Sequence, residues 1–232
     1  MYSVILLMIL CGGIHSIYGE TLPCLFKTYN YFTSTSLYSC FVNSFDNRND
    51  NKVITGFNGM HMANKYDTDV IQIYIHDTNT KFIPANLGFL INLQTLCLET
   101  SQLIEIRSKD FHGMQNLEYL SLNNNKLTSL PSDVLSSLTK LKHISIEHNQ
   151  IKYIGYGLID QFKNMHYVDL RSNNCINKNY SGSSAIIQLI EDVKENCMIS
   201  NDPHVRLISL QQENEELRAQ VEILKQEVDK CY

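Results

Sequence analysis

Serine, histidine and aspartate lie close together in the second half of the chain, in an arrangement that invites comparison with a hydrolase triad. His143 and Ser145 are two residues apart, and Asp169 follows 24 residues after Ser145. In a triad the imidazole takes the serine proton, the carboxylate orients the imidazole, and an oxyanion hole stabilises the intermediate. Here serine and histidine would share one strand, and nothing indicates an oxyanion hole. We therefore predict no catalytic residues; a hydrolase would require Ser145→Ala to abolish a measured activity.

Potential metal ligands also occur near this point, namely His143, Glu147, His148 and His166. Imidazole and carboxylate groups bind zinc, but the sequence has no recognised zinc spacing such as H-E-x-x-H. A solvated surface with at most adventitious metal binding is the simpler interpretation. We expect no metal and no cofactor.

The N-terminal segment resembles a secretory signal. An apolar run from Val4 to Cys11 is followed by small and polar residues up to Gly19, although no Lys or Arg precedes it. We predict that residues 1–19 are a signal peptide, which leaves six of the seven cysteines, with fifteen full pairings, in an oxidising compartment. No second long apolar segment follows, so we expect a secreted, extracellular protein without a membrane partner.

Composition excludes one class of partner. The 232 residues are 44% hydrophobic and 19% charged, which is ordinary for a globular chain. A net charge of -5, with neither a basic run nor a phosphate-binding loop, argues against nucleic acid.

One pattern returns every 24 residues between Leu93 and Asn173, opening at Leu93, Leu117, Leu141 and Met165. It reads apolar, two variable, apolar, one variable, apolar, two variable, and then a small polar residue. The clearest copies are Leu117, Leu120, Leu122, Asn125, Leu127 and Leu130, and then Leu141, Ile144, Ile146, Asn149, Ile151 and Ile154. This pattern is the leucine-rich repeat, at a length common in extracellular proteins.

The repeat predicts an α/β solenoid. Each L-x-L core forms a short strand whose alternate side chains point inward, while the others face out on a concave sheet. Asn125, Asn149 and Asn173 should hydrogen-bond the backbone where the strands turn and form a buried ladder. A helical bundle is the alternative, but the L-x-L spacing contradicts a helical period.

Both ends of a solenoid need covering. Residues 20–69 are the predicted N-terminal cap, closed by a Cys24–Cys40 disulfide, with strands over residues 40–45 and 53–57 extending the sheet. About five repeats then occupy residues 70–174, the first beginning at Val70.

Residues 175–200 are the predicted C-terminal cap. A helix capped by Ser183 or Ser184 should end near Cys197, with a Cys175–Cys197 disulfide pinning it over the core. Asn179 opens a glycosylation sequon, for which we expect an exposed loop.

Residues 201–232 change to a seven-residue repeat. The expected a positions are Leu207, Asn214, Val221 and Val228, and the expected d positions are Leu210, Leu217, Leu224 and Cys231. Valine at a, leucine at d and one buried asparagine favour a parallel two-stranded coiled coil, with an identical or a related chain, and an interchain disulfide at Cys231. Alternatively, the helix folds back on the solenoid, and Cys231 is free or pairs with another protein.

The outward residues of the strands form three columns across the repeats. The first is Gln72, Thr95, Tyr119, His143 and Tyr167, the second is Tyr74, Cys97, Ser121, Ser145 and Asp169, and the third is His76, Glu99, Asn123, Glu147 and Arg171. From them we predict a concave binding face made of Tyr74, His76, Glu99, Tyr119, Asn123, His143, Glu147, Tyr167, Asp169 and Arg171. A merely solvated sheet is the alternative. The thiol of Cys97 should point outward, either bonded to another chain, buried beneath a neighbouring tyrosine, or present by chance.

The order of these parts resembles the leucine-rich repeat immune proteins of mosquitoes and related flies. That resemblance implies a haemolymph protein that acts as a disulfide-linked dimer and presents its repeats to complement-like thioester proteins or to pathogens. This chain differs in its few repeats, its short zipper and its single cysteine at Cys197 where the longer members have a cysteine cluster.

Two functions follow. The first is a secreted, non-enzymatic recognition protein of innate immunity, and the second is an extracellular matrix or adhesion scaffold. Abundance that rises in haemolymph after infection favours the first, and retention in matrix or cuticle favours the second.

Overall fold

The computed structural model describes residues 20–29, 37–47, 53–76 and 78–198, together with Asn214, Leu217, Arg218, Val221 and Lys225. The predicted signal peptide lies outside the described residues. The same is true of Leu207, Leu210, Leu224, Val228 and Cys231 of the predicted coiled coil.

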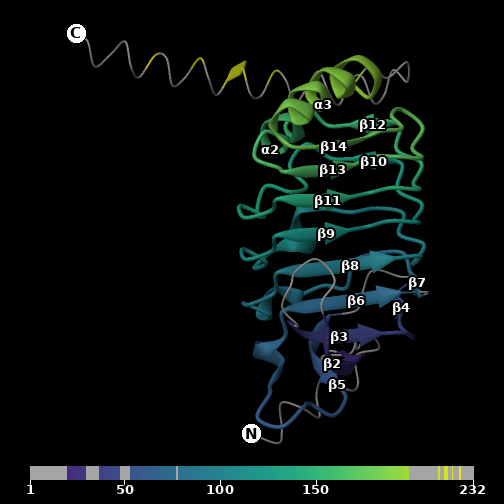
Figure 1. Ribbon diagram of the computed structural model, residues 1–232, viewed down its shortest axis with the longest axis vertical. Coiled ribbons are helices and arrows are strands. Elements are labelled where there is room, and N and C mark those ends of the chain that lie inside the picture. The colour runs from purple at the N-terminus through teal and green to yellow at the C-terminus, as the bar shows by residue number, and fades with distance from the viewer. Residues whose placement is uncertain are drawn as a thin grey trace, which may run out of the picture.

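An eight-stranded sheet forms one side of a solenoid, with its strands stacked along the long axis of the molecule (Figure 1). Its strands are β2 (Leu25–Tyr29), β3 (Leu37–Val42), β6 (Gln72–His76), β8 (Thr95–Glu99), β9 (Tyr119–Ser121), β11 (His143–Ser145), β13 (Tyr167–Asp169) and β14 (Asn179–Ser181). Neighbours from β3 to β13 are parallel, whereas β2 and β14 pair antiparallel at the two edges. Leu96, Leu120, Ile144 and Val168 are cross-strand partners, which confirms the predicted solenoid.

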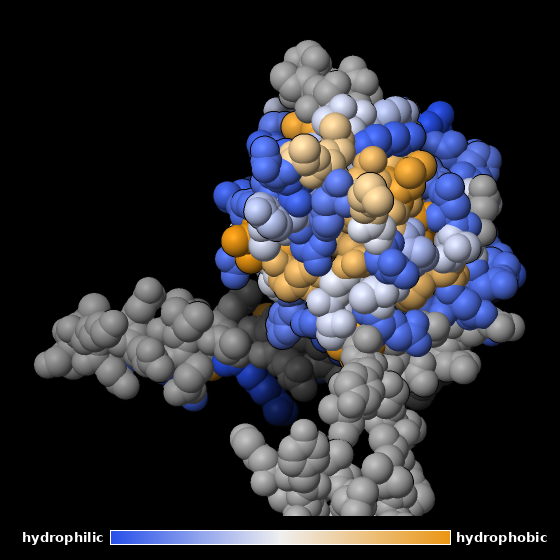
Figure 2. Space-filling model, turned by 90° about the horizontal axis from the view of Figure 1, so that it is seen from below, coloured by the Kyte–Doolittle hydropathy of each residue, from blue (hydrophilic) through white to orange (hydrophobic). Residues whose placement is uncertain are grey.

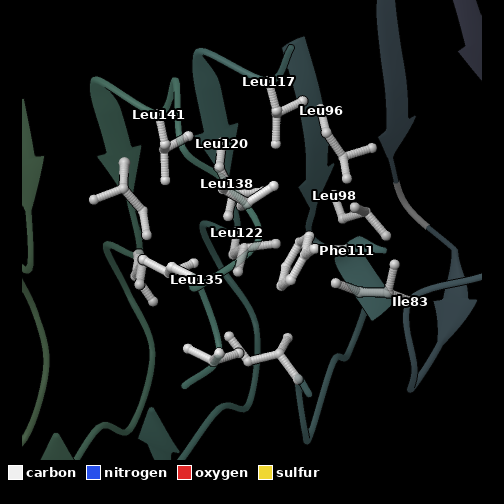
Figure 3. Packing of buried hydrophobic residues seen from close by; sticks show 14 of the residues in the cluster. Ile83, Leu96, Leu98, Phe111, Leu117, Leu120, Leu122, Leu135, Leu138 and Leu141 are labelled. Atoms are coloured by element: carbon white, nitrogen blue, oxygen red, sulfur yellow. The ribbon is translucent and has the colours of Figure 1, made fainter. Parts of the chain in front are cut away.

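Apolar residues from both sides of the solenoid meet in one continuous core. Phe111 and Leu135 point toward the leucines of the strands (Figure 3) and are almost fully buried. The segments between the strands of the main sheet contain 3₁₀ helices at Leu87–Phe89 and Ser108–Phe111 and helix α2 (Leu158–Phe162). A second small sheet joins β10 (Ser129–Leu130) to β12 (Tyr153–Ile154), and another joins β4 (Asp46–Asn47) to β7 (Asn79–Thr80).

An asparagine ladder binds successive repeats together. Asn125 Oδ1 accepts hydrogen bonds from the backbone N–H groups of Ser101 and Leu103 at 3.1 and 2.9 Å, and its Nδ2 donates to the Leu98 carbonyl at 2.8 Å. In the next repeat, Asn149 Oδ1 accepts from the Leu127 N–H and its Nδ2 donates to the Leu122 carbonyl. Asn173 forms the same pair of bonds with the Ile151 N–H and the Ile146 carbonyl, but its side chain is only half-buried. The predicted ladder is therefore present, and its last member is more exposed than expected.

The N-terminal cap is closed by a disulfide between Cys24 and Cys40, as predicted, with the two Cα atoms 5.2 Å apart. The expected strand over residues 40–45 occurs earlier, as β3 at Leu37–Val42, and joins the main sheet. The expected strand over 53–57 is β5 (Ile54–Asn58), which does not extend that sheet. It pairs instead with β1 (Glu20–Pro23), a strand that was not predicted.

A hydrogen-bonded chain fastens the loop after β5 to the cap. Tyr38 Oη lies 2.8 Å from His61 Nδ1, and His61 Nε2 lies 2.8 Å from Asp67 Oδ1. The imidazole also stacks on Phe26, with 4.0 Å between ring centroids. Hydrophobic residues are interspersed among hydrophilic ones over this end of the molecule (Figure 2), and Met60 and Leu25 are both largely exposed.

Helix α3 (Ser183–Asn196) covers the other end of the core (Figure 1). The predicted Cys175–Cys197 disulfide is present, with 5.1 Å between the Cα atoms. The expected serine cap is wrong, because Gly182 occupies the N-cap position and no side chain caps the helix. Tyr180 and Lys178 donate to Asp192 of this helix at 2.6 and 2.9 Å. These bonds, that of Tyr180 foremost, lower the pKa of Asp192 to about 2.

Asn214, Leu217, Arg218, Val221 and Lys225 are helical and exposed. Within the described residues, no helix has the length and apolar character needed to span a bilayer.

Candidate protein-binding surface

The register of the sheet aligns the outward columns that the sequence predicts. Across β6, β8, β9, β11 and β13, the successive partners in the first column are Gln72, Thr95, Tyr119, His143 and Tyr167. The successive partners in the second column are Tyr74, Cys97, Ser121, Ser145 and Asp169. In the third column, His76 pairs with Glu99. Side chains in one column can touch because neighbouring strands lie about 4.8 Å apart.

Accessibility divides this face into two halves. Tyr74 and Cys97, on β6 and β8, are 3% and 1% exposed, so they present almost no surface. On β9, β11 and β13, by contrast, Tyr119, His143 and Tyr167 are partly exposed. The accessible part of the two inner columns therefore lies over these three strands, which we call the open half of the concave face.

The open half contains a hollow of about 360 Å³. It is lined by Tyr119, Leu120, Ser121, His143, Ile144, Ser145 and Tyr167. The Tyr119 and His143 rings stack, with centroids 4.3 Å apart and planes 9° from parallel, and the Tyr167 ring lies 6.4 Å from that of His143. Stacked rings turn their faces toward each other, so a ligand in the hollow meets their edges.

The lining of the hollow is uncharged at neutral pH. Burial lowers the pKa of His143, and the neighbouring His166 and Lys142 lower it further, against a smaller opposing effect of Glu118. An imidazole whose pKa lies below its usual value of about 6.5 is mainly neutral at pH 7. The hollow therefore favours a neutral, largely apolar group.

A charged border runs along one side of the hollow. Arg171 lies 2.6 Å from Glu147 and 2.6 Å from Asp169. Burial acts to raise the pKa of Asp169, but the hydrogen bonds from Arg171 and Tyr167 outweigh it and keep that pKa below its usual value. Asn123 Oδ1 accepts from Ser145 Oγ at 2.8 Å and from the Glu147 N–H at 2.9 Å. These bonds fix the border as a rigid row.

The third column continues toward β6 through Glu99. The Glu99 carboxylate accepts a hydrogen bond from Ser121 Oγ and lies 3.9 Å from His76 Nδ1. Glu99 and His76 are partly exposed, so this column remains accessible beyond the open half.

The serine, histidine and aspartate considered as a triad are engaged by other partners. Ser145 Oγ donates to Asn123, the His143 ring stacks on that of Tyr119, and Asp169 binds Arg171. Throughout the described part of the chain, no group of three or more histidine, cysteine, aspartate or glutamate residues is placed to hold a metal ion.

Cys97 is buried and is the one free cysteine of the described residues. Its register partners on the two sides are Tyr74 and Ser121. Burial, with a smaller contribution from Glu99, raises the pKa of the thiol well above its usual value. Of the three interpretations of this cysteine, the structure supports burial beside a tyrosine.

The set of residues predicted for this face left out polar residues that the structure places at or beside the hollow. Ser121 and Ser145 line it, and the His166 ring lies 5.9 Å from that of His143 at nearly a right angle. The serines belong to the second column, so the repeat pattern was sufficient to find them. His166 precedes β13 and falls outside the three columns, so the sequence marked it only as a potential metal ligand and not as part of the face.

The family model of the leucine rich repeat matches residues 91–151 and 115–175, which together span the repeats from β8 to the start of the C-terminal cap. No curated protein sequence matches the chain.

The solved structures that are similar to this chain include two complexes. One is TLR13 in complex with ssRNA13, at 21% identity and a TM-score of 0.51 over 78% of this chain and 22% of that one. The other is Toll in its complex with Spatzle, described as a hub of Drosophila development and innate immunity, at 24% identity and a TM-score of 0.44 over 51% of this chain and 16% of that one. The chain spans about a fifth of the length of these structures. The TLR13 match supports a leucine-rich repeat fold.

Proposed function

We propose that this leucine-rich repeat protein is a secreted, non-enzymatic recognition molecule that binds a protein partner through the open half of its concave face. The hollow between Tyr119, His143 and Tyr167 is the observation that carries this proposal. Protein interfaces favour aromatic side chains in a desolvated centre surrounded by a polar rim. The Glu147–Arg171–Asp169 border supplies such a rim.

We expect the double variant Tyr119→Ser with Tyr167→Ser to weaken partner binding at least tenfold. Both rings line the hollow, and aromatic residues at the centre of an interface contribute the largest share of affinity. The first step compares the proteins that wild type and the variant capture from extracellular fluid. A protein retained by wild type alone is then titrated against both, and the two dissociation constants are compared.

Tyr156→Ser is the matched control for the face variant, because Tyr156 is an equally large exposed tyrosine that lies next to α2 and outside the sheet. It should leave binding unchanged. A partner that the double variant and the Tyr156 variant retain equally well would disprove the concave face as the binding surface.

The C-terminal segment supports dimerisation as part of the same proposal. Leu217 and Val221 occupy d and a positions of the heptad pattern, have helical backbone and are 52% and 49% exposed in the single chain. A parallel partner helix would cover both side chains, and the asparagine at position 214 would fix the register. Two weak binding surfaces held together gain avidity without any new contact.

We expect light scattering to give the mass of a dimer for wild type and of a monomer for Leu217→Glu with Val221→Glu, because paired carboxylates are not tolerated between the helices. Glu216→Gln, at a c position outside the predicted interface, should remain dimeric. On a non-reducing gel Cys231→Ser should lose the covalent dimer band. A monomeric wild type under both reducing and non-reducing conditions would exclude the coiled coil.

Haemolymph localisation, an innate immune role and complement-like thioester partners are the finer part of this proposal and rest on the resemblance to mosquito proteins. A matrix or adhesion scaffold is the second candidate. Enrichment in haemolymph after infection supports the first, and insolubility with cuticle or matrix supports the second.

A further inference from the structure

The glycosylation sequon lies in the sheet itself. Its three residues, Asn179, Tyr180 and Ser181, are strand β14, the antiparallel edge next to β13, and not the loop that the sequence suggested. Tyr180 is 3% exposed, whereas Asn179 and Ser181 are exposed. Successive residues of a strand point to opposite faces. Asn179 and Ser181 therefore face away from the core.

The register shows which surface Asn179 faces. Directly opposed residues of an antiparallel pair lie on the same side of a sheet. Asn179 is opposite Asp169, and Ser181 is opposite Tyr167. Both residues therefore lie on the concave side, beside the hollow.

The residues opposite the sequon are linked to each other. The Tyr167 hydroxyl donates a hydrogen bond to Asp169 Oδ2 at 2.9 Å. Because Asn179 is opposite Asp169 and Ser181 is opposite Tyr167, the sequon lies directly beside this pair at the edge of the hollow.

From this placement we infer that Asn179 carries an N-linked glycan whose first sugars lie over the β13 end of the concave face. Transfer forms a C–N bond between Asn179 Nδ2 and the anomeric carbon of a lipid diphosphate-linked oligosaccharide. The C–O bond to the diphosphate breaks, and the amide releases one proton.

The glycan limits where a partner can bind. His143 of β11 lies two strands across and two residues along from Asn179, so strand geometry places it roughly 12 Å away, within reach of a bulky sugar attached there. A partner must then approach the hollow from the β9 side. This inference rests on the proposed function, because an N-linked glycan is added only to a chain that enters the secretory pathway.

The first measurement is the intact mass of protein secreted from insect cells, before and after peptide N-glycosidase. The chain is expressed both with its own residues 1–19 and behind an established secretion signal fused before Glu20. The glycan should be present in wild type and in the control Ser183→Ala, and absent from Ser181→Ala and Asn179→Gln. Unmodified wild type from the established signal would overturn the inference, whereas failure of residues 1–19 alone would count only against the proposed signal peptide.

The second measurement tests shielding, with diethyl pyrocarbonate as the probe and site-resolved mass spectrometry as the readout. The probe reacts with neutral imidazoles, and His143 is partly exposed. Modification of His143 should be about threefold faster in Ser181→Ala, which keeps the Asn179 side chain but loses the glycan. Exposed His112, outside the sheet, should react equally in both proteins. Equal rates at His143 would show that the glycan points away from the hollow.

Discussion

Asn125→Ala is expected to lower the free energy of unfolding by about 4 kcal/mol, because several buried backbone groups lose their partner together. The substitution leaves the N–H groups of Ser101 and Leu103 and the carbonyl of Leu98 without the bonds that Asn125 supplies. Asn125 is 7% exposed, so water has little access to these groups. Alanine is smaller and cannot take over any of the three bonds.

Urea unfolding followed by far-ultraviolet circular dichroism measures this loss. Asn164→Ala is the control, because Asn164 is exposed and lies outside the ladder. Surface substitutions of this kind usually change stability by roughly 0.5 kcal/mol or less. A loss below about 1 kcal/mol for Asn125→Ala would mean that the ladder does not hold the repeats together.

Cys175→Ser combined with Cys197→Ser should cost about 3 kcal/mol of stability, the amount expected for opening a loop closed by residues 22 apart. The disulfide ties α3 to the last repeat, and Leu189 and Val193 of this helix are fully buried against the core. Loosening the helix exposes both side chains, so the loss should begin at the C-terminal end of the solenoid.

Hydrogen exchange distinguishes this local effect from a general loss of stability. Amides of α3 should exchange faster in the double serine variant, while those of β8 and β9 should change little below the unfolding transition. Adding a reductant to wild type in mild denaturant should reproduce the change. If amide exchange became faster by the same factor in all strands, the C-terminal cap would not open separately from the rest of the solenoid.

The repeat period was sufficient to predict the order and register of the central strands. Leucines 24 residues apart each need the same buried position, so Leu96 and Leu120 had to become neighbours in the sheet. The two disulfides followed from the need to cover the ends of a solenoid. The outward columns followed from alternation along each strand.

Accessibility of the columns was not predictable in the same way. Tyr74 and Tyr119 are both outward on their strands, yet one is buried and the other partly exposed. The repeat period treats β6 and β9 alike, and burial depends on what packs around each strand. Strand β1 was missed because its pairing with β5 depends on the cap and not on the repeat. Gly182 replaced the expected serine as the N-cap of α3.

The buried thiol of Cys97 has a consequence for oxidative folding. Thiol–disulfide exchange proceeds through the thiolate, and burial raises the pKa of this group well above its usual value. Once β6, β8 and β9 have assembled, Cys97 is therefore protected from scrambling with the four cysteines of the caps. Correct pairing is favoured when the repeats collapse before the sulfurs are oxidised, and Cys97→Ser should raise the yield of native protein in refolding that starts from the fully reduced chain.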